Sequence, residues 1–226
     1  MTQVLRKIFS PLDIGSTTVK NRLMVAAHSH DIWKYDPEGY HRWNMYSERS
    51  MRYYEERAKG GFGLITMGQV MVHPSCGTNR PAGYLDEVVD AYRPMPEAIH
   101  NHGAKVFVQI NHNGRGRISG TDDWDPVLTA KPDFSFYPGA SGEFTKEIDT
   151  EEIEEIVKGF GKTARNMQLA GFDGVEIHAA HSYLLSEFLT PAYNRRTDKY
   201  GGSLENRMRF LMEAIDEVRA QVGKEF

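Results

Sequence analysis

Short apolar segments that alternate with amphipathic helices constrain the fold of this chain more than any other feature. The clearest case is an apolar strand predicted over residues 175–177, which lies between two long predicted helices, over residues 150–170 and from Ser203 onward. Three further strands are predicted over residues 23–27, 64–70 and 106–110. Strands separated by helices in this way are typical of a parallel sheet with helices packed against it. The pattern therefore predicts an α/β fold built from four β/α units.

Capping residues mark the ends of the two long helices. Asp149 and Glu152 have the spacing of a capping box at the start of the first helix, and Gly171 follows its end. Ser203 is the expected N-cap of the second helix, which ends at Gly223. The second helix carries an apolar stripe that we expect to be buried. Its members are Leu204, Met208, Leu211, Met212, Ile215 and Val218.

The remaining segments predict shorter elements and loops. Residues 8–22 predict a short hairpin or an extended lead-in, and further helices are predicted over residues 43–59 and 95–102. Residues 73–85 predict a loop that contains proline and glycine. Residues 116–149, rich in Gly, Pro and Asp, are too long for an ordinary loop. They predict an excursion over one end of the sheet that includes a small hairpin.

Composition excludes several classes of protein. The 226 residues are 40% hydrophobic and 26% charged, which is typical of a domain with a sizeable core. A formal net charge of -4 gives no basic surface for nucleic acid or an anionic membrane. The single cysteine, Cys76, excludes an internal disulfide and a four-cysteine metal or iron–sulfur site within these residues. Without a signal-peptide pattern or an apolar run of ~20 residues, we predict a cytoplasmic protein.

Polar side chains directly follow the strand over residues 175–177. His178, His181 and Tyr183 come within six residues of its end, and active sites of parallel barrels lie where the strands end. Two imidazoles and a phenol can hold an oxyanion and supply a proton. Two histidines three residues apart could also bind a metal, but no third or fourth ligand follows at a suitable spacing, so we predict no metal site. From the residues alone, the better reading of Tyr183 is a packed aromatic whose hydroxyl is satisfied locally.

Two motifs resemble the old yellow enzyme family of FMN oxidoreductases. The first runs from His178 to Arg207 and includes His-x-x-His-x-Tyr, Glu-Phe-Leu-Thr-Pro and Tyr-Gly-Gly-Ser-Leu-Glu-Asn-Arg. The second is Gln-x-x-His-x-Gly-Arg, from Gln109 to Arg115. The first motif is most similar to the branch that holds 2,4-dienoyl-CoA reductase and trimethylamine dehydrogenase. The resemblance implies a TIM (β/α)8-type barrel. Residues 1–226 would then form the N-terminal half of an FMN-binding barrel, with four β/α units after a lead-in hairpin.

The resemblance also implies which residues bind FMN. Gln109 would hydrogen-bond the pyrimidine edge of the flavin, since an amide can both donate and accept. Gly68 would let the backbone approach the ring, although a glycine in a strand also marks a bulge. At the end of the first strand, the expected flavin contacts are Ala26, Ala27, His28 and Ser29. The family usually has proline in place of Ala27 and cysteine or threonine in place of Ser29. Without the resemblance, His28 is read as a loop or packed histidine.

The activity that the resemblance implies is NAD(P)H-dependent reduction of an activated C=C bond in a small molecule such as an enone, enoate or enoyl-CoA. His178 and His181 would bind the substrate carbonyl, and Tyr183 would protonate the α-carbon. One alternative is an amine dehydrogenase of the same family, which His178 disfavours because that branch has tyrosine there. Another is a non-catalytic fragment without flavin. A phosphate site, or a 4Fe-4S cluster, would require residues beyond Phe226, and an oligomer stays open.

Overall fold

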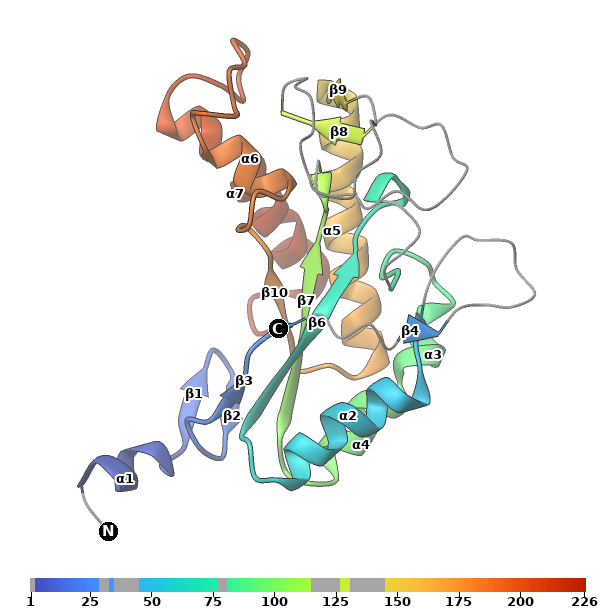
Figure 1. The fold of residues 1–226 in the computed structure, drawn as a ribbon, viewed down its shortest axis with the longest axis vertical. Helices are drawn as coiled ribbons and strands as arrows, with labels where there is room; N and C mark the ends of the chain where they lie inside the picture. The colour runs from blue at the N-terminus through green and yellow to red at the C-terminus, as the bar shows by residue number, and fades with distance from the viewer. Residues whose placement is uncertain (1–2, 29–32, 35–44, 77–80, 115–126, 131–144) are drawn as a thin grey trace.

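The computed structural model describes residues 3–28, 33–34, 45–76, 81–114, 127–130 and 145–226 (Figure 1). Its centre is a four-stranded parallel sheet with the strand order β10-β7-β6-β3. The strands are β3 (Met24–Val25), β6 (Leu64–Met71), β7 (Lys105–Asn111) and β10 (Gly174–Ile177). Each strand pairs with the next one of the set along the chain, which is the order of successive units in a barrel wall. The four predicted strands are confirmed, although β3 is shorter than predicted.

Helices pack against one face of this sheet (Figure 1). α2 and α4 lie beside β6 and β7, α5 lies beside β7 and β10, and α7 packs on α5. The helices are α1 (Gln3–Ile8), α2 (Glu48–Lys59), α3 (Val88–Tyr92), α4 (Pro94–His100), α5 (Thr150–Ala170), α6 (Leu184–Leu189) and α7 (Leu204–Val222), with a 3-10 turn η1 at Pro74–Cys76. α1, α3 and α6 were not predicted. Within the described ranges, no helix is long and apolar enough to cross a membrane.

Among the described residues, three pairs of short strands lie outside the main sheet. β1 (Leu12–Ile14) and β2 (Thr17–Val19) form the predicted antiparallel hairpin. β4 (Trp33–Lys34) pairs antiparallel with β5 (Met45–Tyr46), which occupies part of the helix predicted to begin at residue 43. β8 (Val127–Thr129) and β9 (Thr145–Glu147) pair in parallel, so the hairpin predicted within residues 116–149 is wrong for these two strands. Parallel strands cannot be joined by a tight turn.

Side-chain caps fix where three of the described helices begin. One is α7, whose predicted N-cap Ser203 accepts from the Asn206 N–H at 3.2 Å. α5 starts at the predicted capping box, in which Asp149 Oδ1 accepts from the Glu152 N–H and Glu152 Oε2 accepts from the Asp149 N–H, each at 2.9 Å. Gly171 ends α5 with a φ of 97°, as a C-terminal glycine does. α2 begins after Ser47, later than predicted, because the Ser47 hydroxyl accepts from the Ser50 N–H at 3.2 Å.

The buried face of α7 differs from the predicted stripe. Leu204 is 60% exposed and Met212 is 42% exposed. The helix instead turns Phe210 inward, where its ring lies 5.0 Å from that of Phe188 and 6.5 Å from that of Tyr200. Contacts within this aromatic cluster determine which face of α7 is buried. The apolar periodicity alone does not determine it. The buried residues are Phe210, Ala214, Val218 and Val222, of which the prediction included only Val218.

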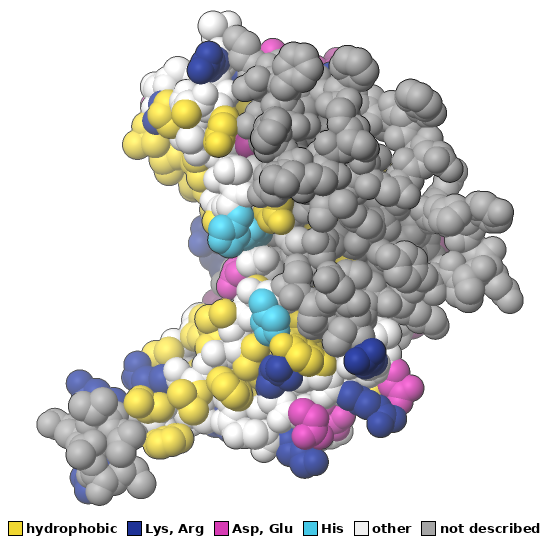
Figure 2. Space-filling view, in the orientation of Figure 1, with side chains coloured by type: hydrophobic (Ala, Val, Ile, Leu, Met, Phe, Trp, Pro, Cys, Tyr) yellow, Lys and Arg dark blue, Asp and Glu magenta, His cyan; other side chains and the backbone are white. Residues whose placement is uncertain are grey.

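Alternation along β7 separates side chains that face the helices from those that do not. Val106, Val108 and Ile110 are buried against the helices, whereas Phe107 and Gln109 are half-buried on the opposite face. We call this opposite face of the sheet the open face. Figure 2 shows that the molecule is hollowed on the side where β10 lies, with histidine side chains at two places along the hollow.

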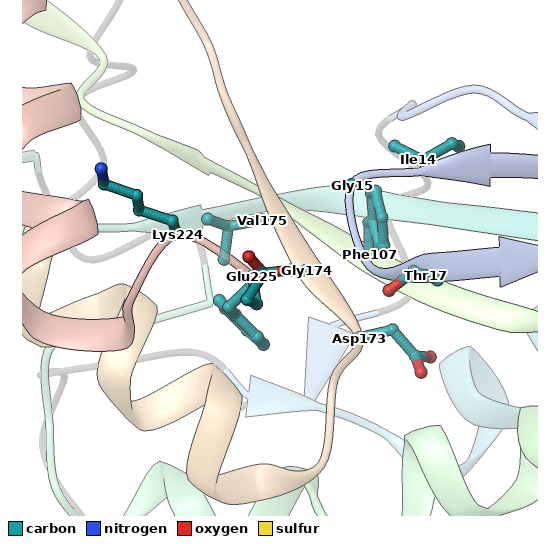
Figure 3. Close-up of a pocket in the computed structure, with 10 residues that line it drawn as sticks. Ile14, Gly15, Thr17, Phe107, Asp173, Gly174, Val175, Lys224 and Glu225 are labelled. Atoms are coloured by element: carbon teal, nitrogen blue, oxygen red, sulfur yellow. The ribbon is translucent and has the colours of Figure 1, made fainter.

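A pocket of about 200 Å³ lies at the end of the sheet where the strands begin. Figure 3 shows hairpin residues such as Ile14 and Thr17 on one side of β10 and Lys224 and Glu225 on the other. The Ser16 hydroxyl donates to the Glu225 carbonyl at 2.6 Å and ties the hairpin to this segment. The pocket is at the opposite end of β10 from the predicted site, so it belongs to the packing of the hairpin.

Asp173, just before β10, is expected to make the fold sensitive to acid. Its carboxylate accepts from His100 Nε2 at 2.6 Å, Lys105 Nζ at 2.8 Å and the Val106 N–H at 2.9 Å. Burial raises the pKa of the Asp173 carboxyl, but these three hydrogen bonds outweigh it and lower that pKa. We expect Asp173→Asn to reduce the free energy of unfolding at pH 7 by about 2 kcal/mol, measured by urea denaturation.

The pH dependence of this loss has a definite sign. A carboxyl whose pKa is lowered by folding stabilises the fold above its unfolded pKa, and the contribution disappears as the pH falls through the folded value. The difference between the wild type and Asp173→Asn should therefore shrink below about pH 4. Asp90→Asn is the matched control, because its side chain is 92% exposed in a surface pair with Arg93. Equal losses in both variants at pH 7 would contradict the assignment.

Candidate functional site

The three predicted residues after β10 lie together. The His178 N–H donates to the Ile110 carbonyl at 3.0 Å, which extends the pairing with β7 one residue past β10. The ring centroid of His178 lies 5.0 Å from that of His181 and 5.1 Å from that of Tyr183. His178 is buried, His181 is exposed and Tyr183 is half-buried. The structure therefore brings two imidazoles and a phenol to the end of the sheet where the strands finish.

An unusual turn makes this cluster. His181 and Ser182 both have a φ of 58°, in the left-handed region that side chains other than glycine seldom adopt. The turn brings Tyr183 back beside His178, and the Tyr183 N–H donates to the Ala180 carbonyl at 3.2 Å. Tyr183 is the N-cap of α6 but makes no side-chain capping bond. Two consecutive residues in this region cost energy, and such strain gathers at functional sites.

His178 is held in its neutral form. Burial, and then the neighbouring His181, lower the pKa of His178 from 6.5 to about 4. His178 Nε2 lies 3.3 Å from His181 Nδ1, so a single hydrogen lies between the two rings. Whichever ring carries that hydrogen, the pair keeps another N–H that can donate outward. The pair can therefore stabilise a developing negative charge without first becoming charged.

Gln109 lies on the open face beside Glu176. The two residues are register partners in β7 and β10, and Gln109 Nε2 donates to Glu176 Oε1 at 2.5 Å. A carboxylate only accepts, so the amide nitrogen of Gln109 must face Glu176 and its oxygen must face away. The sequence analysis did not single out Glu176 as a partner of Gln109. The signal for its actual role is the strand register, which no single strand contains.

Gly68 lies at a bulge in β6. The register of β6 against β7 shifts between Met67 and Val70, and a Cβ on Gly68 would lie 2.6 Å from the His28 carbonyl oxygen. The freed backbone groups are satisfied by two buried tyrosines: Tyr46 Oη donates to the Gly68 carbonyl at 2.5 Å, and the Gly68 N–H donates to Tyr54 Oη at 2.8 Å. The structure confirms the alternative that Gly68 marks a bulge. A flavin contact stays a prediction.

The end of β3 lies at the same end of the sheet as these residues. Met24 and Ala26 are exposed while Val25 between them is buried, so Ala26 belongs to the open face. Ala27 and His28 are half-buried. His28 Nδ1 lies 2.8 Å from the Ala26 carbonyl, to which it must donate, and Nε2 lies 2.5 Å from Tyr53 Oη. Ser29 and Arg115 lie outside the described residues.

The family model for the NADH:flavin oxidoreductase / NADH oxidase family matches residues 7–226. The chain belongs to this family. It is 38% identical over 240 residues to cinnamate reductase of Clostridium sporogenes, covering 100% of this chain and 34% of that protein. It is 34% identical to N,N-dimethylglycine/sarcosine dehydrogenase of Chromohalobacter salexigens, covering 97% and 31%. The chain thus spans about a third of the length of these curated relatives.

Solved structures of the family share the fold. Old yellow enzyme from Pichia sp. AKU4542 superposes with a TM-score of 0.84 at 31% identity, over 97% of this chain and 57% of that one. This NADH:flavin oxidoreductase chain therefore has a TIM-barrel-type α/β fold, of which the described residues form four successive units. That residues 1–226 are half of one barrel domain stays a prediction.

The open face of this family member fits one edge of a flavin. Gln109 offers an amide oxygen that faces away from Glu176 and a second N–H, which together match an edge with both donors and acceptors. Ala26 follows β3, which β6 separates from β7, and its small side chain leaves that strand end unobstructed. These residues would hold the ring system. No group for the FMN phosphate is assigned among the residues that the structure describes.

Proposed function

We propose that this chain is the flavin-binding part of an FMN-dependent oxidoreductase that reduces an activated C=C bond with NAD(P)H. The observation that carries the proposal is the cluster of His178, His181 and Tyr183, at the same end of the sheet as Gln109. FMN, when bound, would supply the hydride transfer. The side chains of this chain would bind the cofactor, hold the substrate and deliver the proton.

The histidine pair and the tyrosine have separate parts in this proposal. The outward N–H of the histidine pair would donate to the substrate carbonyl oxygen, on which negative charge develops. Because burial keeps His178 neutral, this donor does not depend on protonation near pH 7. The Tyr183 hydroxyl would donate its proton to the carbon next to that carbonyl. A substrate with a carbonyl conjugated to the double bond suits this arrangement.

A second candidate is oxidation of an amine, which the similarity to N,N-dimethylglycine/sarcosine dehydrogenase favours. A neutral histidine pair would then bind an amine or its carboxylate in place of an enone carbonyl. Turnover assays with cyclohexenone-type enones, enoyl-CoA esters and methylamines separate the two candidates. A third reading is a chain that binds no flavin, because the chain spans only about a third of the length of the cinnamate reductase and the dehydrogenase named above.

Binding of FMN tests the proposal most directly. The purified chain, titrated with FMN and followed by visible absorption, is expected to bind it, and Gln109→Leu is expected to weaken binding about tenfold. Leucine keeps the size of the side chain but removes both hydrogen-bonding groups. Gln221→Leu on the exposed face of α7 is the matched control and should bind as the wild type does. If the wild-type chain binds no FMN, the proposed function of this chain is wrong.

A further inference from the structure

A buried histidine that the proposed chemistry does not use lies at the end of β7. His112 is 1% exposed, and its Nδ1 lies 3.1 Å from the Gly114 nitrogen. A backbone N–H can only donate, so Nδ1 is the acceptor and the proton of the neutral ring is on Nε2. Nε2 lies 2.9 Å from the Ser75 hydroxyl and donates to it. The two ring nitrogens of His112 therefore hold two different segments.

On the Ser75 side, the hydrogen bonds continue to His73. The Ser75 hydroxyl lies 2.8 Å from His73 Nδ1, which also accepts from the Ser75 N–H at 3.3 Å. Burial lowers the pKa of His73, so its Nδ1 stays available as an acceptor. The hydrogen bonds therefore run in one direction, from His112 to Ser75 to His73, and anchor one side of the His112 ring in the η1 turn.

The Gly114 side leads to Tyr183. Gly114 has a φ of 52°, and a Cβ there would lie 2.9 Å from the Leu184 nitrogen and 3.0 Å from its Cα. The Leu184 N–H donates to the His112 carbonyl at 3.1 Å. Leu184 is the fully buried first residue of α6, and Tyr183 is the N-cap directly before it. The backbone that carries Tyr183 therefore rests on the segment that His112 holds.

We propose that His112 is a positioning residue for Tyr183, which it holds in place through Gly114 and Leu184. The bond from the Gly114 N–H to Nδ1 is the part that positions Tyr183, whereas the bond from Nε2 to Ser75 only anchors the ring. A displacement of the Tyr183 hydroxyl by about 1 Å would be enough to slow a proton transfer on the order of 100-fold. The consequence for catalysis rests on the proposed function, but the consequence for the geometry does not.

Two substitutions at His112 test the contributions of its two ring nitrogens separately. His112→Asn places an acceptor oxygen near the position of Nδ1 but is too short to reach Ser75. His112→Gln places an N–H donor near the position of Nε2 and leaves no acceptor beside Gly114. Asparagine is one methylene shorter than glutamine and removes more of the ring's volume. An effect of lost volume would therefore be larger in His112→Asn, which is the opposite of the expected order. Ser75→Ala is a third variant that removes the anchor without changing His112.

The readout of geometry is a fluorine resonance at position 183. With 3-fluorotyrosine introduced there in the full chain, His112→Gln is expected to shift and broaden the fluorine signal. His112→Asn and Ser75→Ala are expected to keep the wild-type position. Equal shifts in His112→Asn and His112→Gln, or no shift in either, would overturn the proposal. A shift in Ser75→Ala as large as that in His112→Gln would overturn the assignment to Gly114.

The catalytic readout uses the same variants with FMN bound. His112→Gln is expected to slow reoxidation of the flavin by an enone about 10- to 100-fold, with His112→Asn within about threefold of the wild type. Reduction of the flavin by NAD(P)H should not separate the two variants. If the wild type does not react with any alkene, the proposed function fails, while the fluorine measurement still decides the position of Tyr183. If both His112 variants fail to fold, a shift of the fluorine signal in Ser75→Ala still overturns the assignment to Gly114.

Discussion

Replacement of Tyr183 by phenylalanine is expected to slow reoxidation of the flavin by an alkene by about 100-fold or more. The phenylalanine keeps the ring that packs 5.1 Å from His178, so the turn through His181 and Ser182 should keep its shape. What it removes is the hydroxyl that we propose as the proton donor. Stopped-flow absorption measures the two half-reactions separately, and reduction of the flavin by NAD(P)H should stay within about twofold of the wild type.

The control for this prediction is Tyr193→Phe, at a 39% exposed tyrosine beyond α6. It removes a phenol hydroxyl from the same stretch of chain and should leave both half-reactions unchanged. If Tyr183→Phe slows both half-reactions to the same extent, Tyr183 acts in cofactor binding or in folding and is not the proton donor. If it slows neither, another group supplies the proton.

Replacement of Gly159 by alanine is expected to cost about 3 kcal/mol of the free energy of unfolding. Alanine inside a helix normally gains up to about 1 kcal/mol over glycine. In α5, however, a Cβ on Gly159 would lie 2.4 Å from the Val72 carbonyl oxygen, which is backbone just past β6. Helix and sheet would have to separate, because neither backbone can turn aside locally. Urea denaturation measures the loss.

Gly161, two residues further along α5, provides the matched control. A Cβ there would meet the Cγ atoms of Glu217 and Gln221 at 2.7 and 2.9 Å. Both belong to flexible side chains of α7 that can move toward solvent. Gly161→Ala should therefore change the stability by less than about 1 kcal/mol. If the two alanine variants are equally stable, α5 does not approach β6 as closely as the structure has it.

The order of elements was predictable because it depends on local patterns. The four strands, and the start of α5 at Asp149, follow from runs of apolar residues and from a capping box that lies within four residues. The face that α7 buries was not predictable in the same way. Its apolar residues surround much of the helix, and contact of Phe210 with Phe188 and Tyr200 on other segments selects the buried side.

The candidate site shows the same division. That His178, His181 and Tyr183 lie together could be predicted, since all three follow one strand end closely. The pairing of Gln109 with Glu176 could not, because it depends on the register between strands that are distant in sequence. The left-handed backbone at His181 and Ser182 also carries no local signal such as glycine. The roles of all these residues in binding and catalysis stay predictions.

The hydrogen bonds of Tyr46 and Tyr54 with the Gly68 backbone have a consequence for protein engineering. Both phenols are buried, and their hydrogen bonds hold the backbone at the bulge in β6. Mutagenesis libraries restricted to side chains lining the hollow would leave these two hydrogen bonds unchanged. Replacing either tyrosine would change the backbone of β6 at Gly68 without adding a side chain to the hollow.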